Sequence, residues 1–222
     1  HLHPVCRSRS VWEINYQDVA AIGELFTTGN VNHSRVISLA GVGVNAPTLM
    51  RVPVGGNVFD LTVGRIKHDD NYRLISGSAL YGTNIDDDNK WMSRRHLQIT
   101  CIPEGRESKL FSWLTTGFDL FSVKRIFMSH ITKPKVYHFD TSMRGSPRSM
   151  VPVGSYESIM PLDIIMTPFL KYLIVKDTEM AEKLGALELL EEDLSLATYV
   201  SPSKADFAPI LRDTLDSIRK EI

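Results

Sequence analysis

The segment LATYVSPSK, Leu196–Lys204, is the first place where residue types and spacing suggest chemistry. It follows an acidic turn and contains a proline, as the end of a four-iron cluster loop does. Such loops have the form C-x2-C-x2-C-x3-C-P, because four thiolates must converge on one cube of iron and sulfide. With the proline of this form set at Pro202, the ligand positions are Glu191, Leu194, Ala197 and Ser201.

None of these four residues can supply a thiolate, so the segment predicts no iron–sulfur cluster. Leucine and alanine carry no donor atom, and a glutamate with a serine would not hold a cluster. Apolar side chains at such positions can instead fill the space that a cluster would occupy. On these residues alone, an ordinary turn after a short helix is the simpler interpretation.

Two other motifs suggest binding sites but fail on spacing. A calcium loop that starts at Asp86, in the run DDDN, needs glycine at its sixth position and glutamate at its twelfth. Those positions hold Trp91 and Leu97, which favours a solvated loop. The segment AGVGVN, Ala40–Asn45, has a G-x-G but no third glycine that opens a helix. A hairpin turn therefore explains it better than a dinucleotide site.

The histidines and cysteines show no metal-binding spacing. The histidines form neither H-E-x-x-H nor a zinc pairing with cysteine, and the H-x-H of His1 and His3 is interpreted as a frayed end. Cys6 and Cys101 lie far apart in the sequence and belong to no C-x-x-C pair, which indicates a reducing compartment. A disulfide between these two cysteines is the alternative. The sequence has no nucleophile elbow and no Walker loop, so nothing local predicts catalysis.

The composition allows one large or two small domains in 222 residues, and the hydrophobic share of 43% can supply real cores. A formal net charge of −1 gives the whole chain no bias toward nucleic acid or an anionic membrane surface. The chain lacks an initiator methionine and a signal-peptide pattern, and we interpret it as part of a longer protein. The apolar segment Ser158–Val175 contains Asp163, Lys171 and two prolines, which argues against a membrane span.

The elements before residue 103 follow a β-grasp pattern, in which two strands, a helix and further strands make an α+β domain. A helix precedes them at Tyr16–Thr28, capped by Asn15 and ended by Gly29. The expected strands are Ser34–Gly41, Pro47–Gly56, Tyr72–Gly82 and Arg94–Ile102, with a short helix at Asn57–Ile66.

The pattern changes after residue 103. A helix at 107–114 and strands at Phe118–Phe127 and 135–143 are expected in the first part. The later part is helical, with Thr167 as an N-cap, Asp177 as the cap of a short helix and Asp206 as the cap of the last helix. The last helix has an apolar stripe of Phe207, Ile210, Leu211, Leu215 and Ile218.

Five separated segments resemble the A subunit of the sodium-translocating NADH:quinone oxidoreductase (Nqr), in the order typical of that family. The segments are YQDVAAIGELFTTGNVNHSRVISLAG, LISGSALYG, MVPVGSYESIMPLDI, LGALELLEEDLSLATYVSPSK and PILRDTLDSIRKE. The chain is similar to the C-terminal half of that subunit. The family in turn resembles the C subunit of the Rnf complex and the flavin-binding subunit of complex I.

The resemblance implies four parts. They are the tail of a truncated Rossmann-like domain (1–33), a β-grasp domain of the soluble-ligand-binding type (34–102), a connecting β-rich segment (103–149) and a helical domain (150–222). The helical domain resembles a ferredoxin-like domain without its cluster, because the Rnf relative keeps cysteines at the positions of Glu191, Leu194, Ala197 and Ser201. The resemblance thus implies that LATYVSPSK is a relic cluster loop, retained for its fold.

The resemblance also implies a function. It implies a peripheral subunit on the cytoplasmic face of the bacterial inner membrane, in a complex that oxidises NADH, reduces ubiquinone or menaquinone and exports sodium. Sibling subunits would carry the flavins and the iron centre, and this chain would hold no cofactor. The resemblance therefore implies the other Nqr subunits as partners, and it makes quinone a candidate ligand. The alternative is a free-standing β-grasp module that binds a soluble ligand.

The apolar segment Ile159–Val175 has two interpretations. Fourteen of its seventeen residues are apolar. The helical core is the favoured interpretation, since buried helices have the same pattern. The alternative is a surface that docks a membrane sibling or lines a path for a quinone tail, with Ile165, Phe169 and Tyr172 as the candidate residues.

Overall fold

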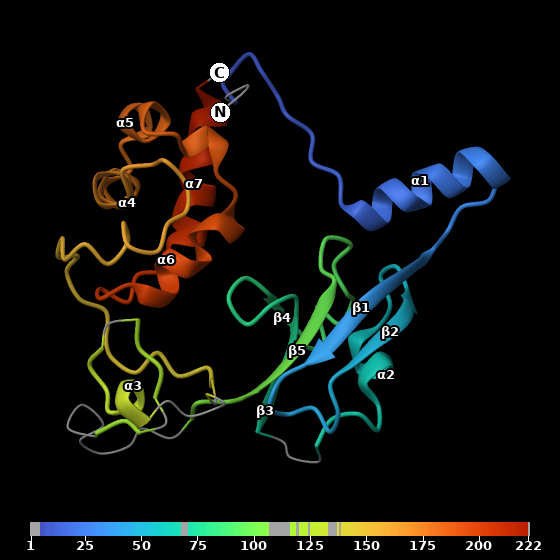
Figure 1. The fold of residues 1–222 in the computed structure, drawn as a ribbon. Helices are drawn as coiled ribbons and strands as arrows, with labels where there is room; N and C mark the ends of the chain where they lie inside the picture. The colour runs from blue at the N-terminus through green and yellow to red at the C-terminus, as the bar shows by residue number, and fades with distance from the viewer. Residues whose placement is uncertain are drawn as a thin grey trace. The chain divides into compact units, whose positions relative to one another are not determined.

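The computed structural model describes residues 5–67, 71–106, 116–118, 120–123, 125–132, 137 and 139–221. The H-x-H of the first residues and the helix expected at 107–114 lie outside this part of the chain. Two compact units form, one from Ile14–Arg144 and the other from His1–Glu13 with Gly145–Ile222. The first contains a five-stranded sheet and the second is helical, which confirms the mixed α+β class (Figure 1).

The sheet has the strand order β2-β1-β5-β3-β4. Its strands are β1 (Ser34–Ala40), β2 (Thr48–Pro53), β3 (Tyr72–Ser76), β4 (Thr83–Asn84) and β5 (Gln98–Pro103). The central pair β1 and β5 is parallel, and every other pair is antiparallel. Ile37, Leu39 and Ile99 are buried in the core of this unit, because the side chains of a strand alternate between its faces.

The β1–β2 hairpin closes tightly against β5. A Cβ atom on Gly41, whose φ is +118°, would lie 2.1 Å from the carbonyl oxygen of Cys101. Helix α2 (Val58–Thr62) follows the hairpin, is capped by the Asn57 side chain and buries Val58. The strand expected over Tyr72–Gly82 ends already at Ser76, because Gly77 has a φ of +105° and turns the chain into a loop.

Helix α1 (Tyr16–Thr28) has the predicted caps, Asn15 at its start and Gly29 at its end. The side-chain amide of Gln17 both donates to the carbonyl of Val36 and accepts from its N–H, at 2.8 and 2.9 Å. Asp18 forms ion pairs with Arg35 and Arg94. These bonds attach the first turns of α1 to the sheet. The apolar residues of the helix, Val19, Ile22, Leu25 and Phe26, are exposed.

The expectation of a β-rich segment at 103–149 is wrong for the part that the structure describes. No strand forms in the described residues of 118–127 or 135–143, and the element found there is the short helix α3 (Ser129–Thr132). Phe121 instead packs edge-to-face on Tyr137 and Phe139. Aromatic and β-branched residues favour a strand only where a neighbouring strand completes its hydrogen bonds.

The helical unit packs around one apolar core. Its elements are α4 (Met166–Val175), α5 (Thr178–Lys183), the 3-10 turns η2 (Ala186–Glu188) and η3 (Glu191–Leu194), α6 (Ser195–Val200) and α7 (Phe207–Lys220). Asp177 and Asp206 cap α5 and α7 as predicted. Thr167 does not cap α4, since it lies inside the helix and its N–H donates to Glu157 Oε1 at 3.0 Å. Among the described residues, no helix has the length and apolar character to cross a membrane.

Candidate functional site

The four positions at which a cluster loop would carry its ligands lie on η3, on α6 and directly after α6 in the helical unit. Leu194 ends η3, Ala197 lies in α6, and Ser201 follows α6 directly. Leu194 and Ala197 are both 0% exposed and belong to the same core as Phe169, Phe207 and Leu211. Side-chain packing therefore fills the two central positions, which leaves no apolar gap for a cluster.

Ser201 belongs to a buried hydroxyl network. Its Oγ lies 3.2 Å from the hydroxyl of Tyr156 and 2.8 Å from Oγ of Ser203, and it accepts a bond from the N–H of Ala205 at 3.3 Å. Tyr156 packs edge-to-face on Phe207, which begins the last helix. The serine that stands where a ligand would stand thus fastens the loop to the core.

Glu191, the first of the four positions, points to a different partner. Its carboxylate pairs with Arg212 of α7, on the side of the loop that faces that helix. The neighbouring Glu192 has one buried oxygen, Oε2, without a hydrogen bond among the described residues. The four positions thus offer a glutamate that is already paired, two apolar side chains and a serine. These residues do not fit an iron–sulfur cluster, which needs thiolates.

Two basic residues meet at the exit of the loop, Lys204 of the loop itself and Arg148 from an earlier segment. Lys204 adopts a positive φ of 59°, and its N–H donates to the carbonyl of Ser201 at 3.2 Å. Burial lowers the pKa of the Lys204 amine, and the neighbouring Arg148 lowers it further. Arg148 also donates its backbone N–H to the carbonyl of Ser203 at 3.0 Å. The loop is therefore held by backbone and hydroxyl bonds.

The thiols of the chain do not contribute to this loop. Cys101 lies on β5 in the other unit, where burial raises the pKa of its thiol to about 11. Cys6 is exposed, and hydrogen bonds from Ser8 lower the pKa of its thiol. No group of three or more histidine, cysteine or acidic side chains in the described ranges could hold a metal ion.

Ser76 and His96 form a hydroxyl–imidazole pair, of the kind that activates a nucleophile in some enzymes. Oγ of Ser76 lies 3.0 Å from Nδ1 of His96. However, Ser76 is only 1% exposed, and its Oγ also accepts a bond from the N–H of Ser93. The pair therefore fixes the loop after β3 and presents no hydroxyl to a substrate.

Helix α4 separates the three residues that the sequence suggested as a docking or quinone-proximal surface. Phe169 is 0% exposed and lies in the core of the helical unit, whereas Ile165 is 65% exposed. Tyr172 is half-buried between these extremes. The favoured core interpretation thus holds for one face of α4, and Ile165 before the helix and Ile174 and Val175 at its end stay exposed.

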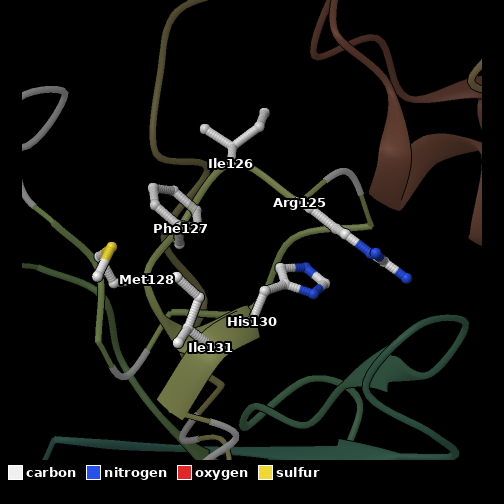
Figure 2. A pocket seen from close by; sticks show the side chains of 6 residues that line it. All are labelled: Arg125, Ile126, Phe127, Met128, His130 and Ile131. Carbon is white, nitrogen blue, oxygen red and sulfur yellow. The ribbon is translucent and has the colours of Figure 1, made fainter.

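A hollow that the sequence analysis missed lies in the sheet-containing unit, beside α3. It has a volume of about 510 Å³ and is lined by Arg125, Ile126, Phe127, Met128, His130 and Ile131. Figure 2 shows the two basic side chains on one side of the turn and Phe127, Met128 and Ile131 on the other. The signal in the sequence was local charge, because no acidic residue occurs from 120 to 139.

The chain matches known protein families and relatives along its whole length. A family model described as NQRA C-terminal domain (NQRA_SLBB) matches residues 36–87, and one described as NqrA second alpha/beta domain matches residues 1–31. The A subunit of the Na(+)-translocating NADH-quinone reductase of Photorhabdus laumondii is 46% identical over 224 residues, which cover 100% of this chain. The corresponding subunits of Cellvibrio japonicus and Pseudomonas aeruginosa are 50% and 49% identical, again over the whole chain.

The chain belongs to the NqrA family. It spans about half the length of the curated relatives that it matches, since the alignments cover 49–50% of each of them. The NQRA C-terminal domain match begins within β1 and ends just after β4, so it includes the hairpin and α2. The segment 191–204 and the hollow at 125–131 both lie outside the two family-model matches, but inside the alignments with NqrA relatives.

Proposed function

We propose that the chain is part of a peripheral subunit of a sodium-pumping NADH:quinone oxidoreductase, at the cytoplasmic face of the bacterial inner membrane. The complex would couple NADH oxidation and quinone reduction to sodium export. The observation that carries the proposal is the identity of 46–50% to NqrA relatives over the entire chain. The flavins and the iron centre would then belong to other subunits.

The role of this chain within the complex is that of a cofactor-free framework. The packing at Leu194 and Ala197 and the hydroxyl bonds of Ser201 support this role, because they use the loop for folding. The Arg212–Glu191 ion pair adds a bond between the loop and α7. A chain built in this way holds its partners in place and carries no electrons itself.

The sheet-containing unit is proposed to be a β-grasp domain of the soluble-ligand-binding type. The parallel pairing of β1 with β5 at the centre of the order β2-β1-β5-β3-β4 supports it, as does α2 after the first hairpin. The helical unit is likewise proposed to descend from a ferredoxin-like domain, on the evidence of its filled loop.

The exposed face of α4 is the proposed docking surface for a sibling subunit, or for the apolar tail of a quinone. Ile165, directly before the helix, and Val175, its last residue, are 65% and 69% exposed, and Ile174 beside Val175 is 42% exposed. Met166, Phe169, Leu170 and Leu173 hold the other face in the core. The surface is thus presented by a helix whose position the core fixes.

Exchange of Ile165 tests this surface. Ile165→Asp is expected to keep the melting temperature within a few degrees, because the side chain is exposed, and to abolish co-purification with the sibling subunits. Phe169→Asp should instead unfold the helical unit, since it buries a charge in the core. Val63→Asp, at another exposed apolar residue, is the matched control and should leave assembly intact.

The same purification distinguishes the subunit role from the alternative, a free-standing module that binds a soluble ligand. A protein that purifies without sibling subunits and retains a small molecule would be a free-standing β-grasp module. Full assembly of the Ile165→Asp variant would remove α4 from the docking surface.

A further inference from the structure

The hollow beside α3 is held open by hydrogen bonds within its own segment. The N–H of Met128 donates to the carbonyl of Thr116 at 3.0 Å, and Oγ of Ser129 donates to the carbonyl of Leu120 at 2.5 Å. Nε2–H of His130 donates to the carbonyl of Ser122 at 2.9 Å. The imidazole is therefore fixed at the edge of the hollow.

Three of the apolar side chains that line the hollow are exposed. Ile126 and Ile131 are 72% and 74% exposed, and Met128 is 39% exposed. Gly117 supports Phe127 from behind, since a Cβ atom there would lie 2.5 Å from the ring. Three large apolar side chains that remain accessible within six residues, at one hollow, favour a surface that contacts another apolar phase.

The sequence of this segment is positively charged, although the whole chain is slightly negative. Residues 120–139 contain four lysines and arginines and no acidic residue, and Arg125 is the one of these four that the structure describes. The formal net charge of the whole chain is −1. Arg125 has no hydrogen bond or ion pair with any described residue, so its guanidinium is available to an external anion.

We infer that this segment binds an anionic phospholipid at a bilayer surface. Ile126, Met128 and Ile131 enter the boundary of the acyl chains, and Arg125 binds the phosphate of the head group, with His130 beside it. The combination of exposed apolar side chains, basic residues and absent acids is the one that peripheral proteins use at anionic leaflets. Lipid binding at this segment is independent of docking through α4.

Vesicle sedimentation of the full-length protein tests it. The protein should sediment with phosphatidylcholine vesicles that contain phosphatidylglycerol, and remain in solution with pure phosphatidylcholine. High salt should release it, because screening weakens the attraction. Arg125→Gln should weaken binding about fivefold and Ile131→Ser about tenfold, as expected for one basic contact and one apolar side chain at the interface.

The controls use exposed residues elsewhere in the same unit. Arg65→Gln and Val63→Ser remove the same groups from the turn after α2 and should sediment like the original protein. Ile165→Asp should also keep lipid binding, which distinguishes this inference from docking through α4. Equal binding to neutral vesicles, no binding to either kind, or equal effects of Arg125→Gln and Arg65→Gln would each overturn it.

Discussion

At the scale of single residues, packing and hydrogen bonds occupy the positions at which a cluster loop would carry its ligands. A cluster loop needs four thiolates, and here leucine and alanine fill the centre while serine forms hydrogen bonds to Tyr156 and Ser203. The identity of these residues was readable from the sequence, and it predicted the loss of ligands. The burial of these residues could not be predicted, because the same sequence is compatible with an exposed turn and with a loop that fills a core.

The ion pair of Arg73 and Glu104 gives a pH-dependent prediction. Nε and Nη2 of Arg73 donate to the two carboxylate oxygens at 2.6 and 3.0 Å, and these bonds lower the pKa of Glu104. A lowered folded pKa stabilises the protein above the usual carboxyl pKa, and this contribution disappears as pH falls through the folded value. Glu104→Gln is expected to lower the free energy of unfolding by about 0.5–1 kcal/mol at pH 7, because solvent screens a pair whose arginine is partly exposed.

Thermal melts from neutral to acidic pH measure this effect. The difference between Glu104→Gln and the original protein should shrink as the medium becomes acidic. Asp87→Asn, at an exposed acid in a loop of the same unit, is the control and should change little at any pH. A difference that stays constant down to acid would show that the ion pair does not stabilise the fold.

At the scale of elements, local signals in the sequence predicted best where the chain itself supplies the hydrogen bonds. Asn15, Asp177 and Asp206 cap their helices because each side chain accepts from an N–H two or three residues ahead. The strands expected at Phe118–Phe127 and 135–143 do not form in the residues of these ranges that the structure describes, since a strand depends on a neighbour that local pattern cannot identify. The start of α4 was misplaced for a similar reason, because its cap comes from the distant Glu157.

The hairpin turn provides the test at this scale. Gly41→Ala is expected to destabilise the protein by about 2–4 kcal/mol, because the new methyl group meets the backbone of Cys101 and φ is positive. Gly55→Ala also has a positive φ, but no atom lies within 4 Å of the new Cβ. It should cost only about 1–2 kcal/mol. Equal costs in urea unfolding would mean that β5 does not constrain the turn.

At the scale of the whole molecule, the net charge of the chain gave no indication of the basic segment beside α3. A net charge of −1 argued against an anionic membrane surface, yet one segment of twenty residues has four basic residues and no acidic one. The class of fold and its family could be predicted from the sequence, since motif order and patterning extend along the chain. The hollow could not, because Arg125 and Ile131 come together only through hydrogen bonds that the pattern does not encode.

The central claim, that this chain is a framework without a redox centre, is tested most directly by iron analysis and a visible spectrum of the protein purified without oxygen. The account predicts a colourless protein with no bound iron. Stoichiometric iron, with a broad visible absorption that disappears in the Ser201→Ala variant, would contradict it.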